Sequence, residues 1–177
     1  DLMQQNAYVY GPDPAGFPPF QGLETEAYLD LLLALRAEFA SDPGVSVFAA
    51  PSGPQWVTEA AWQRIGSWTK DQRMPLHTHC LESPYEAEYA RRAYGGSAVV
   101  YLDRLGALHE YTALVHGVYL DEAELALMSK RGASLITNPS SNLRLRCGVS
   151  PVLKALSRGV RVALANDSCT LGEHDDA

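Results

Sequence analysis

The chain has 177 residues, 46% of them hydrophobic and 20% charged, which is ordinary for one globular unit with a sizeable core. Its 14 basic and 21 acidic side chains give a formal charge of −7, and the sequence lacks a Lys/Arg-rich block, which argues against a nucleic-acid partner or an anionic membrane surface. The longest apolar stretch, around Leu31–Leu35, is too short for a membrane span. The three cysteines lack C-x-x-C spacing, which excludes a zinc ribbon, so we expect reduced thiols in a cytoplasmic protein.

The first part of the chain is predicted to form a loop, a helix and a strand. Residues 11–22 are rich in Pro and Gly, which favours a loop-rich lead-in over residues 1–22. Residues 24–40 repeat Leu, Ala and Phe at helical spacing, which predicts an amphipathic helix. The apolar run Val45–Ala50, closed by Pro51, is typical of a buried parallel strand.

The alternation of helices and strands continues to the end of the chain. Further strands are predicted over residues 74–80, 112–116, 134–137 and 161–165, and further helices over residues 58–72, 85–94, 122–131 and 150–158, with a short one around 99–104. Thr58 is expected to cap its helix, and Gly132 and Gly159 to end theirs in the left-handed conformation. Five strand–helix units predict an α/β fold with a parallel sheet covered by helices.

Two α/β architectures fit this order: an open doubly wound sheet and part of a (β/α)8 TIM barrel. Neither G-x-G-x-x-G nor G-x-x-x-x-G-K-[ST] follows a predicted strand, so a nucleotide-binding sheet loses its main support. A whole barrel needs about 200 residues or more. The sequence therefore predicts a single partial barrel domain over residues 1–177, with its alternating units over residues 23–177.

Reactive side chains gather where the predicted strands end, on the face that carries the sites of barrels. His77 and His79 close one strand, His116 closes the next, and polar residues follow the last two strands over residues 138–142 and 166–168. Each has a plainer interpretation, as a buried hydrogen-bonded histidine, a core residue, a turn cap or a loop. Their coincidence at one end of successive strands favours a site.

The types of these residues point to metal chemistry. His79, His116 and Asp167 are ligands of the kind that zinc or ferrous iron accepts. Glu82 stands three residues after His79, where a carboxylate can move protons without binding the metal itself.

Three segments resemble the amidohydrolase superfamily, namely LHTHCLES, LVHGVYLDEAELALMSKRGASLITNPSSNLRLRCGVSPV and GVRVALANDS. Within it they are similar to the branch of guanine, cytosine and S-adenosylhomocysteine deaminases and triazine hydrolases. The most specific pieces are P-x-S-N-x-[KR]-L-x-x-G, from Pro139 to Gly148, and the H-x-x-E step from His79 to Glu82. The resemblance runs from about Val45 to the end, and implies barrel strands four to eight.

The resemblance implies a role for each matching residue. His79, chosen over His77, and Asp167 would bind one divalent metal, zinc or else iron, and Asp167 would also take a proton from the attacking water. Glu82 would shuttle protons, and His116 would touch that water or the substrate. The family's first-strand H-x-H, which supplies two more metal ligands, is absent from this sequence.

The resemblance also implies substrate-binding residues. Ser141 and Asn142 match the loop that shapes the site, while Ser52 stands where many relatives have a substrate-contacting histidine. Gln55 and Trp56 could bind the substrate instead, although Trp56 could equally be a structural residue under the loop.

The function implied is that of an aminohydrolase that acts on C–N bonds other than peptide bonds. It would deaminate a small purine, pyrimidine or triazine-like heterocycle with water that the metal activates. The alternatives are a triazine chlorohydrolase or cyclic amide hydrolase with the same site, or an inactive α/β fragment that lacks the first-strand ligands. We expect the open edges of a partial barrel to be covered by further chain, by disorder, or by a second copy in a homodimer.

Overall fold

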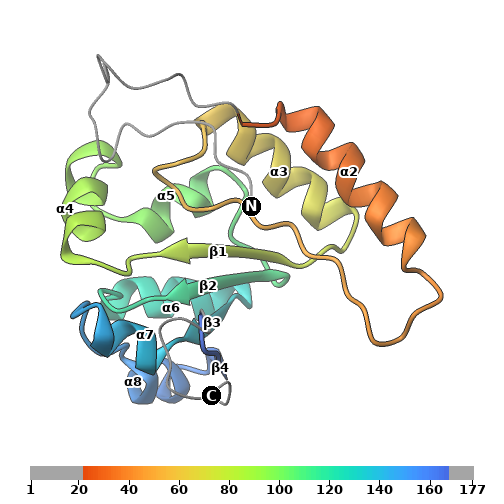
Figure 1. Cartoon of the computed structure of the whole chain (residues 1–177). Helices are drawn as coiled ribbons and strands as arrows, with labels where there is room; N and C mark the ends of the chain where they lie inside the picture. Colours follow the sequence, from red (N-terminus) through yellow and green to blue (C-terminus); the bar gives the residue numbers. More distant parts are fainter. Residues whose placement is uncertain (1–21, 168–177) are drawn as a thin grey trace.

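The fold is built on a parallel sheet of four strands in the order β1-β2-β3-β4, drawn from the computed structural model in Figure 1. The structure describes residues 22–167, so nearly all of the predicted lead-in lies outside the described part. The strands are β1 (Leu76–Cys80), β2 (Thr112–His116), β3 (Ser134–Thr137) and β4 (Arg161–Leu164). The helices are α2 (Thr25–Glu38), α3 (Glu59–Asp71), α4 (Pro84–Ala93), α5 (Ala98–Arg104), α6 (Glu122–Arg131), α7 (Pro139–Arg144) and α8 (Val152–Ser157).

This order confirms the predicted α/β class. Every neighbouring pair of strands is parallel, and at least one helix separates each strand from the next along the chain. Parallel strands need such crossovers, because the chain must return to the same end of the sheet before it adds another strand. The carboxyl ends of all four strands therefore meet at one edge.

The sequence of β1 gives its two faces different neighbours. Leu76, Thr78 and Cys80 are buried, whereas His77 and His79 between them are only partly buried. Alternate residues of a strand point to opposite faces. Since Leu76 and Cys80 belong to the hydrophobic core, the two histidines lie on the other face of the sheet.

The core fixes the sheet against its helices. It contains large, fully buried side chains from three helices and three strands: Trp62, Ile65, Leu102, Leu125, Met128, Leu76, Leu114 and Leu135. Full burial of such a side chain contributes about 1.5–3 kcal/mol. Figure 1 shows α2 alongside α3, and the Arg64 guanidinium joins the two helices by donating two hydrogen bonds to Glu26. The strand ends therefore project from a rigid frame.

The helix ends follow their expected signals. The Thr58 hydroxyl accepts a hydrogen bond from the Ala61 N–H at the start of α3. Gly132 ends α6 with φ 72°, and Gly159 follows α8 with φ 77°. Glycine adopts this left-handed conformation without the steric cost that a side chain brings. These three sequence predictions are confirmed.

Two predicted elements are wrong. The run Val45–Ala50 forms no regular strand, and only Ala49 pairs with Leu76 in an isolated bridge. The Ala49 carbonyl accepts the His77 N–H and the Ser52 carbonyl accepts the His79 N–H, so within the described residues the run meets β1 only at its carboxyl end. The loop expected after β3 is instead the short helix α7, because Pro139 occupies its first turn, where the fixed φ of proline suits a helix.

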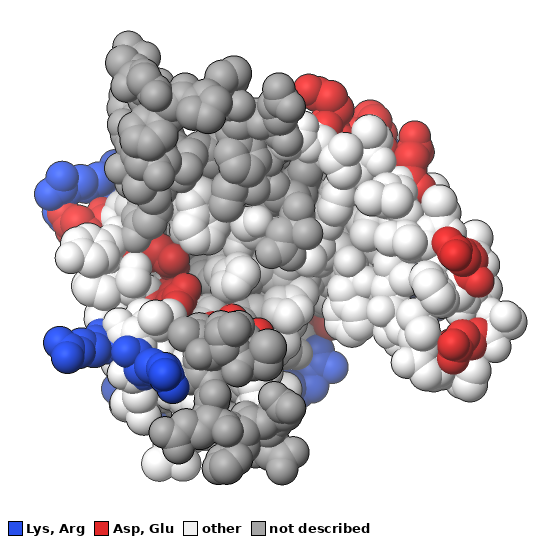
Figure 2. All heavy atoms as spheres, in the orientation of Figure 1, with Lys and Arg blue, Asp and Glu red and all other residues white. Residues whose placement is uncertain are grey.

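The surface agrees with the acidic composition. Figure 2 shows acidic side chains spread along the edge formed by α2, with most of the basic side chains of the visible face on the opposite side. No helix between residues 22 and 167 combines the length and apolar character needed to cross a membrane.

Candidate metal centre

Three predicted site residues converge at the carboxyl edge of the sheet. His79 lies in β1, His116 ends β2, and Asp167 follows β4. Each offers one ligand atom, and the three atoms lie within 4.8 Å of one another. The His79 and His116 rings stack with their centroids 5.4 Å apart. Residues separated by up to 88 positions in the sequence thus form one cluster of metal-binding type.

The ring of His79 is oriented by a backbone carbonyl. Its Nδ1 lies 2.6 Å from the Ser52 carbonyl oxygen, which can only accept, so Nδ1 carries the proton and donates it. Nε2 is then the unprotonated nitrogen. Metal-binding histidines typically have such a partner on the second nitrogen, because it fixes the tautomer and the ring plane. Ser52 therefore acts through its backbone carbonyl.

His116 is held in an unusual backbone conformation. Its φ is 70°, a left-handed value that costs a residue with a side chain about 1–3 kcal/mol. The side chain is buried, and its Nδ1 lies 2.8 Å from Oδ1 of Asn142. The Asn142 side-chain nitrogen donates to the Ser150 hydroxyl, which in turn donates to the His116 carbonyl. This network leaves Nε2 of His116 facing the Glu82 carboxylate.

Asp167 is fixed by a neighbouring hydroxyl. The Ser141 hydroxyl donates a hydrogen bond of 2.5 Å to Oδ2 of Asp167, which leaves Oδ1 without this partner. The backbone of Asp167 is also left-handed, with φ 72°. Aspartate tolerates this conformation better than most residues.

Glu82 lies between two polar neighbours. Its Oε2 is 3.7 Å from Nε2 of His116, and its Oε1 is 3.9 Å from the Cys147 sulfur. The side chain is 18% exposed. A carboxylate in this position can exchange protons with a ligand while remaining next to the cluster.

The other predicted residues lie around this centre. His77 shares the face of His79 but is not part of the three-residue cluster, and burial is the main cause that lowers its pKa. Gln55 is buried and Trp56 partly buried, with the Trp56 ring 6.4 Å from that of His79. Arg144 is exposed on α7. Ser168 lies outside the described residues.

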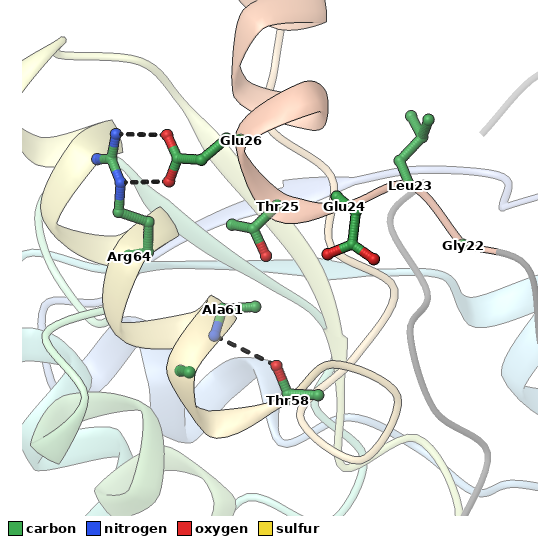
Figure 3. A pocket seen from close by; sticks show the side chains of 9 residues that line it. Gly22, Leu23, Glu24, Thr25, Glu26, Thr58, Ala61 and Arg64 are labelled. Carbon is green, nitrogen blue, oxygen red and sulfur yellow. Dashed lines mark hydrogen bonds and ion pairs between the residues drawn. The ribbon is translucent and has the colours of Figure 1, made fainter.

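A cavity of about 210 Å³ adjoins the cluster. It is lined by Ala50, Pro51, His77, His79, Val115, Ile136, Asn138, Ala165 and Asp167. A larger hollow of about 500 Å³ lies where α2 and α3 begin, and Figure 3 shows Glu24, Glu26 and Arg64 on its wall. Its lining residues include no histidine or cysteine. The candidate metal cluster therefore adjoins the smaller cavity, whose lining includes His79 and Asp167.

Two contributors to the site were not predicted, and a third, Asn138, was expected only as one of the polar residues after β3. The Asn138 side-chain nitrogen lies 3.4 Å and 3.5 Å from the two ring nitrogens of His116, and among residues 22–167 the Asn138 Oδ1 has no hydrogen-bond partner. Ser150 holds the His116 carbonyl, and the Glu86 carboxylate accepts the Glu82 N–H at 2.8 Å. Asn138 and Ser150 flank the most specific sequence motif, whereas the only signal for Glu86 was its position three residues after Ser83, the pattern of a capping box.

Comparisons of the sequence agree with the geometry. The sequence model of the amidohydrolase family matches residues 8–175. A 5-methylthioadenosine/S-adenosylhomocysteine deaminase of Syntrophobacter fumaroxidans is 33% identical over 143 residues, which are 81% of this chain and 33% of the relative. A 5'-deoxyadenosine deaminase of Methanopyrus kandleri is 32% identical over 71% of this chain and 29% of its own length. The chain spans about a third of the length of these relatives.

Solved structures show the same fold. An adenosine deaminase from Xanthomonas campestris with bound zinc superposes with a TM-score of 0.82 at 30% identity, over 90% of this chain and 36% of that one. Atrazine chlorohydrolase TrzN from Arthrobacter aurescens, complexed with zinc, gives a TM-score of 0.77 at 20% identity, over 92% and 36%. Each likeness covers about a third of a larger chain, and the parallel sheet agrees with the predicted partial barrel except for the strand expected over residues 45–50.

Proposed function

The chain belongs to the amidohydrolase family, and from this premise we propose that it contributes the metal centre of an enzyme that hydrolytically deaminates an adenine-type heterocycle. The observation that carries the proposal is the convergence of His79, His116 and Asp167 within 4.8 Å. The relatives that are 33% and 32% identical over the matched residues support the heterocycle, because they are named as deaminases of 5-methylthioadenosine/S-adenosylhomocysteine and of 5'-deoxyadenosine.

The residues present fit a zinc ion. His79 and Asp167 supply an imidazole nitrogen and a carboxylate oxygen, a donor set that zinc accepts, and each is oriented by a hydrogen bond on its other polar atom. When bound, the ion supplies Lewis acidity and lowers the pKa of water to about 7. We expect the remaining protein ligands from sequence that the relatives have and this chain does not cover.

In the proposed reaction, Asp167 and Glu82 transfer protons and His116 orients the attacking water. The Asp167 carboxylate accepts a proton from the attacking water, whose oxygen bonds to the amino-bearing ring carbon. His116 orients that water and stabilises the charge developing on its oxygen. Glu82, protonated at the start, gives its proton to the adjacent ring nitrogen. The Asp167 carboxyl then gives the proton it accepted to the amine, so the C–N bond breaks and ammonia leaves, while Glu82 regains a proton from the new hydroxyl as this becomes the carbonyl oxygen. General acid–base catalysis of this kind contributes about 10²–10⁴ in rate.

Two finer features accompany this proposal. The free thiols of Cys80 and Cys147 support a cytoplasmic location, because thiols persist in a reducing compartment. A homodimer stays a prediction. The triazine chlorohydrolase alternative rests on a likeness of 20% identity, which speaks for the fold alone, so the deaminase is favoured.

The test removes the proton shuttle and keeps the metal. In the intact zinc-loaded protein, Glu82→Gln should lower the rate of ammonia release from an adenine nucleoside by about 10²-fold or more and leave the zinc content unchanged. Glu88→Gln is the control, because Glu88 is a surface residue of α4 paired with Arg91 and Arg92. Undiminished turnover in the Glu82 variant would contradict the proposed role.

A further inference from the structure

Glu86 is a buried carboxyl group in the first turn of α4, and the mechanism above leaves it without a role. Its side chain is only 6% exposed, and Oε2 accepts the backbone N–H of Glu82 at 2.8 Å. Burial raises its pKa to about 7, against the opposing hydrogen bond from Glu82. Burial of a carboxyl group costs free energy, so this position of Glu86 needs a structural or functional explanation.

The hydrogen bond differs from that of an ordinary helix cap. In α6, the carboxylate of Glu124 accepts the N–H of the N-cap residue Asp121, three residues earlier. Glu86 occupies the same position of α4, where the Ser83 hydroxyl accepts its N–H. Its carboxylate reaches one residue further back, to the N–H of Glu82 instead of that of the N-cap. The side chain of the capping position thus holds the proposed proton shuttle.

The backbone conformation before Glu82 explains why the hydrogen bond between the Glu82 N–H and the Glu86 carboxylate is important. Leu81 has φ 54°, a left-handed backbone conformation that is unfavourable for a residue with a bulky side chain. The bend is pinned on its other side, since the carbonyls of Cys80 and Leu81 accept the N–H groups of Gly117 and Tyr119. The Glu82 N–H is pinned by Glu86. Without it, one side of the bend between β1 and α4 loses its restraint.

The groups around Glu86 connect it to the rest of the site. The carboxylate of Glu82 raises its pKa, whereas His79 and the neighbouring Gln55 side chain lower it. Gln55 belongs to the loop where substrate contacts are predicted. One carboxyl group therefore lies between the loop, the metal-binding histidine and Glu82.

We infer that Glu86 is a positioning residue that fixes Glu82 for proton transfer by holding its backbone N–H. The inference rests on the proposed deaminase function. A side chain in this position needs a hydrogen-bond acceptor of the right length, and does not need a charge.

The experiment compares three variants in the intact zinc-loaded protein with an adenine nucleoside as substrate. Glu86→Ala removes the acceptor and should lower kcat about tenfold or more while KM changes less than about threefold, because displacement of a catalytic group by a fraction of an ångström is costly. Glu86→Gln keeps an acceptor at the same length and should restore most of kcat. Glu86→Asp keeps the charge with a side chain one carbon shorter, and should lose kcat like Glu86→Ala.

Glu124→Ala is the matched control, because Glu124 has the same helix position and similar burial, at 5% exposed, but lies in α6. It should lose stability and keep kcat. If Glu86→Ala does not fold, Glu86→Asp decides. Full kcat in Glu86→Asp, or equal kcat in Glu86→Ala and Glu124→Ala, would overturn the inference. An inactive wild-type protein would instead refute the deaminase proposal itself.

Discussion

The burial of Glu86 makes the stability of the protein depend on pH in a defined direction. The pKa of its carboxyl is raised from 4.5 to about 7, so between these values the folded chain binds a proton that the unfolded chain releases. The free energy of unfolding therefore falls as the pH rises through this window, and levels off above pH 7. At 1.36 kcal/mol per pH unit, the change in pKa from 4.5 to about 7 corresponds to about 3 kcal/mol over the whole window.

The perturbation is Glu86→Gln, which removes this titration and keeps the shape of the side chain. Urea unfolding of both proteins at about pH 5 and pH 8, followed by tryptophan fluorescence, gives the free energy of unfolding at each pH. The buried Trp62 and Trp68 report on the core. Metal must first be removed with a chelator, because a cation beside His79 would lower the pKa of Glu86. Because pH 5 already lies inside the window, the variant should gain about 2.5 kcal/mol relative to wild type between the two pH values.

The difference in the free energy of unfolding between wild type and Glu86→Gln removes the contribution of groups that titrate in both proteins. Glu88→Gln is the control, since Arg91 and Arg92 hold the pKa of the Glu88 carboxyl at about 2 and it stays ionised throughout the range. A difference between wild type and Glu86→Gln that is the same at both pH values would refute the reasoning.

Two further predictions concern the metal ligand and the core. Ser141→Ala removes the hydroxyl that orients Asp167 and should weaken zinc binding about 10–100-fold in a chelator competition. Ser140→Ala, at an exposed position, should not change it. Equal zinc affinities of Ser141→Ala and wild type would contradict the orienting role of Ser141. Gly66→Ala places a Cβ 2.8 Å from the Ala107 backbone and should lower the free energy of unfolding by about 1–3 kcal/mol. Urea unfolding measures this change. A variant as stable as wild type would show that α3 and the backbone at Ala107 can move apart without cost.

The strands and most helices could be predicted because their signals are local. Apolar runs bounded by Gly or Pro, a Thr cap and glycines after basic helix ends each act within a few residues. The run at residues 45–50 has the same local signal, but a strand also needs neighbours, and the described part supplies one only at Ala49. The polar stretch after β3 is predicted as a loop and forms α7, where proline in the first turn starts a helix.

The site residues could be found for a different reason. His79, His116 and Asp167 lie at or just after the carboxyl ends of parallel strands, so topology alone brings them to one edge. The partners that orient them could not be found in the same way. Ser52 acts by its backbone carbonyl, and Glu86 depends on the left-handed conformation of Leu81, which no local preference of leucine predicts.

Zinc binding by the intact protein tests the central claim most directly. The account predicts one zinc ion per chain, with anomalous scattering in a crystal placing it against the His79 imidazole and the Asp167 carboxylate. His79→Ala should lose the ion, whereas His77→Ala, on the same face of β1 but outside the cluster, should retain it. A full complement of zinc in His79→Ala, or a zinc ion found away from both residues, would contradict the account.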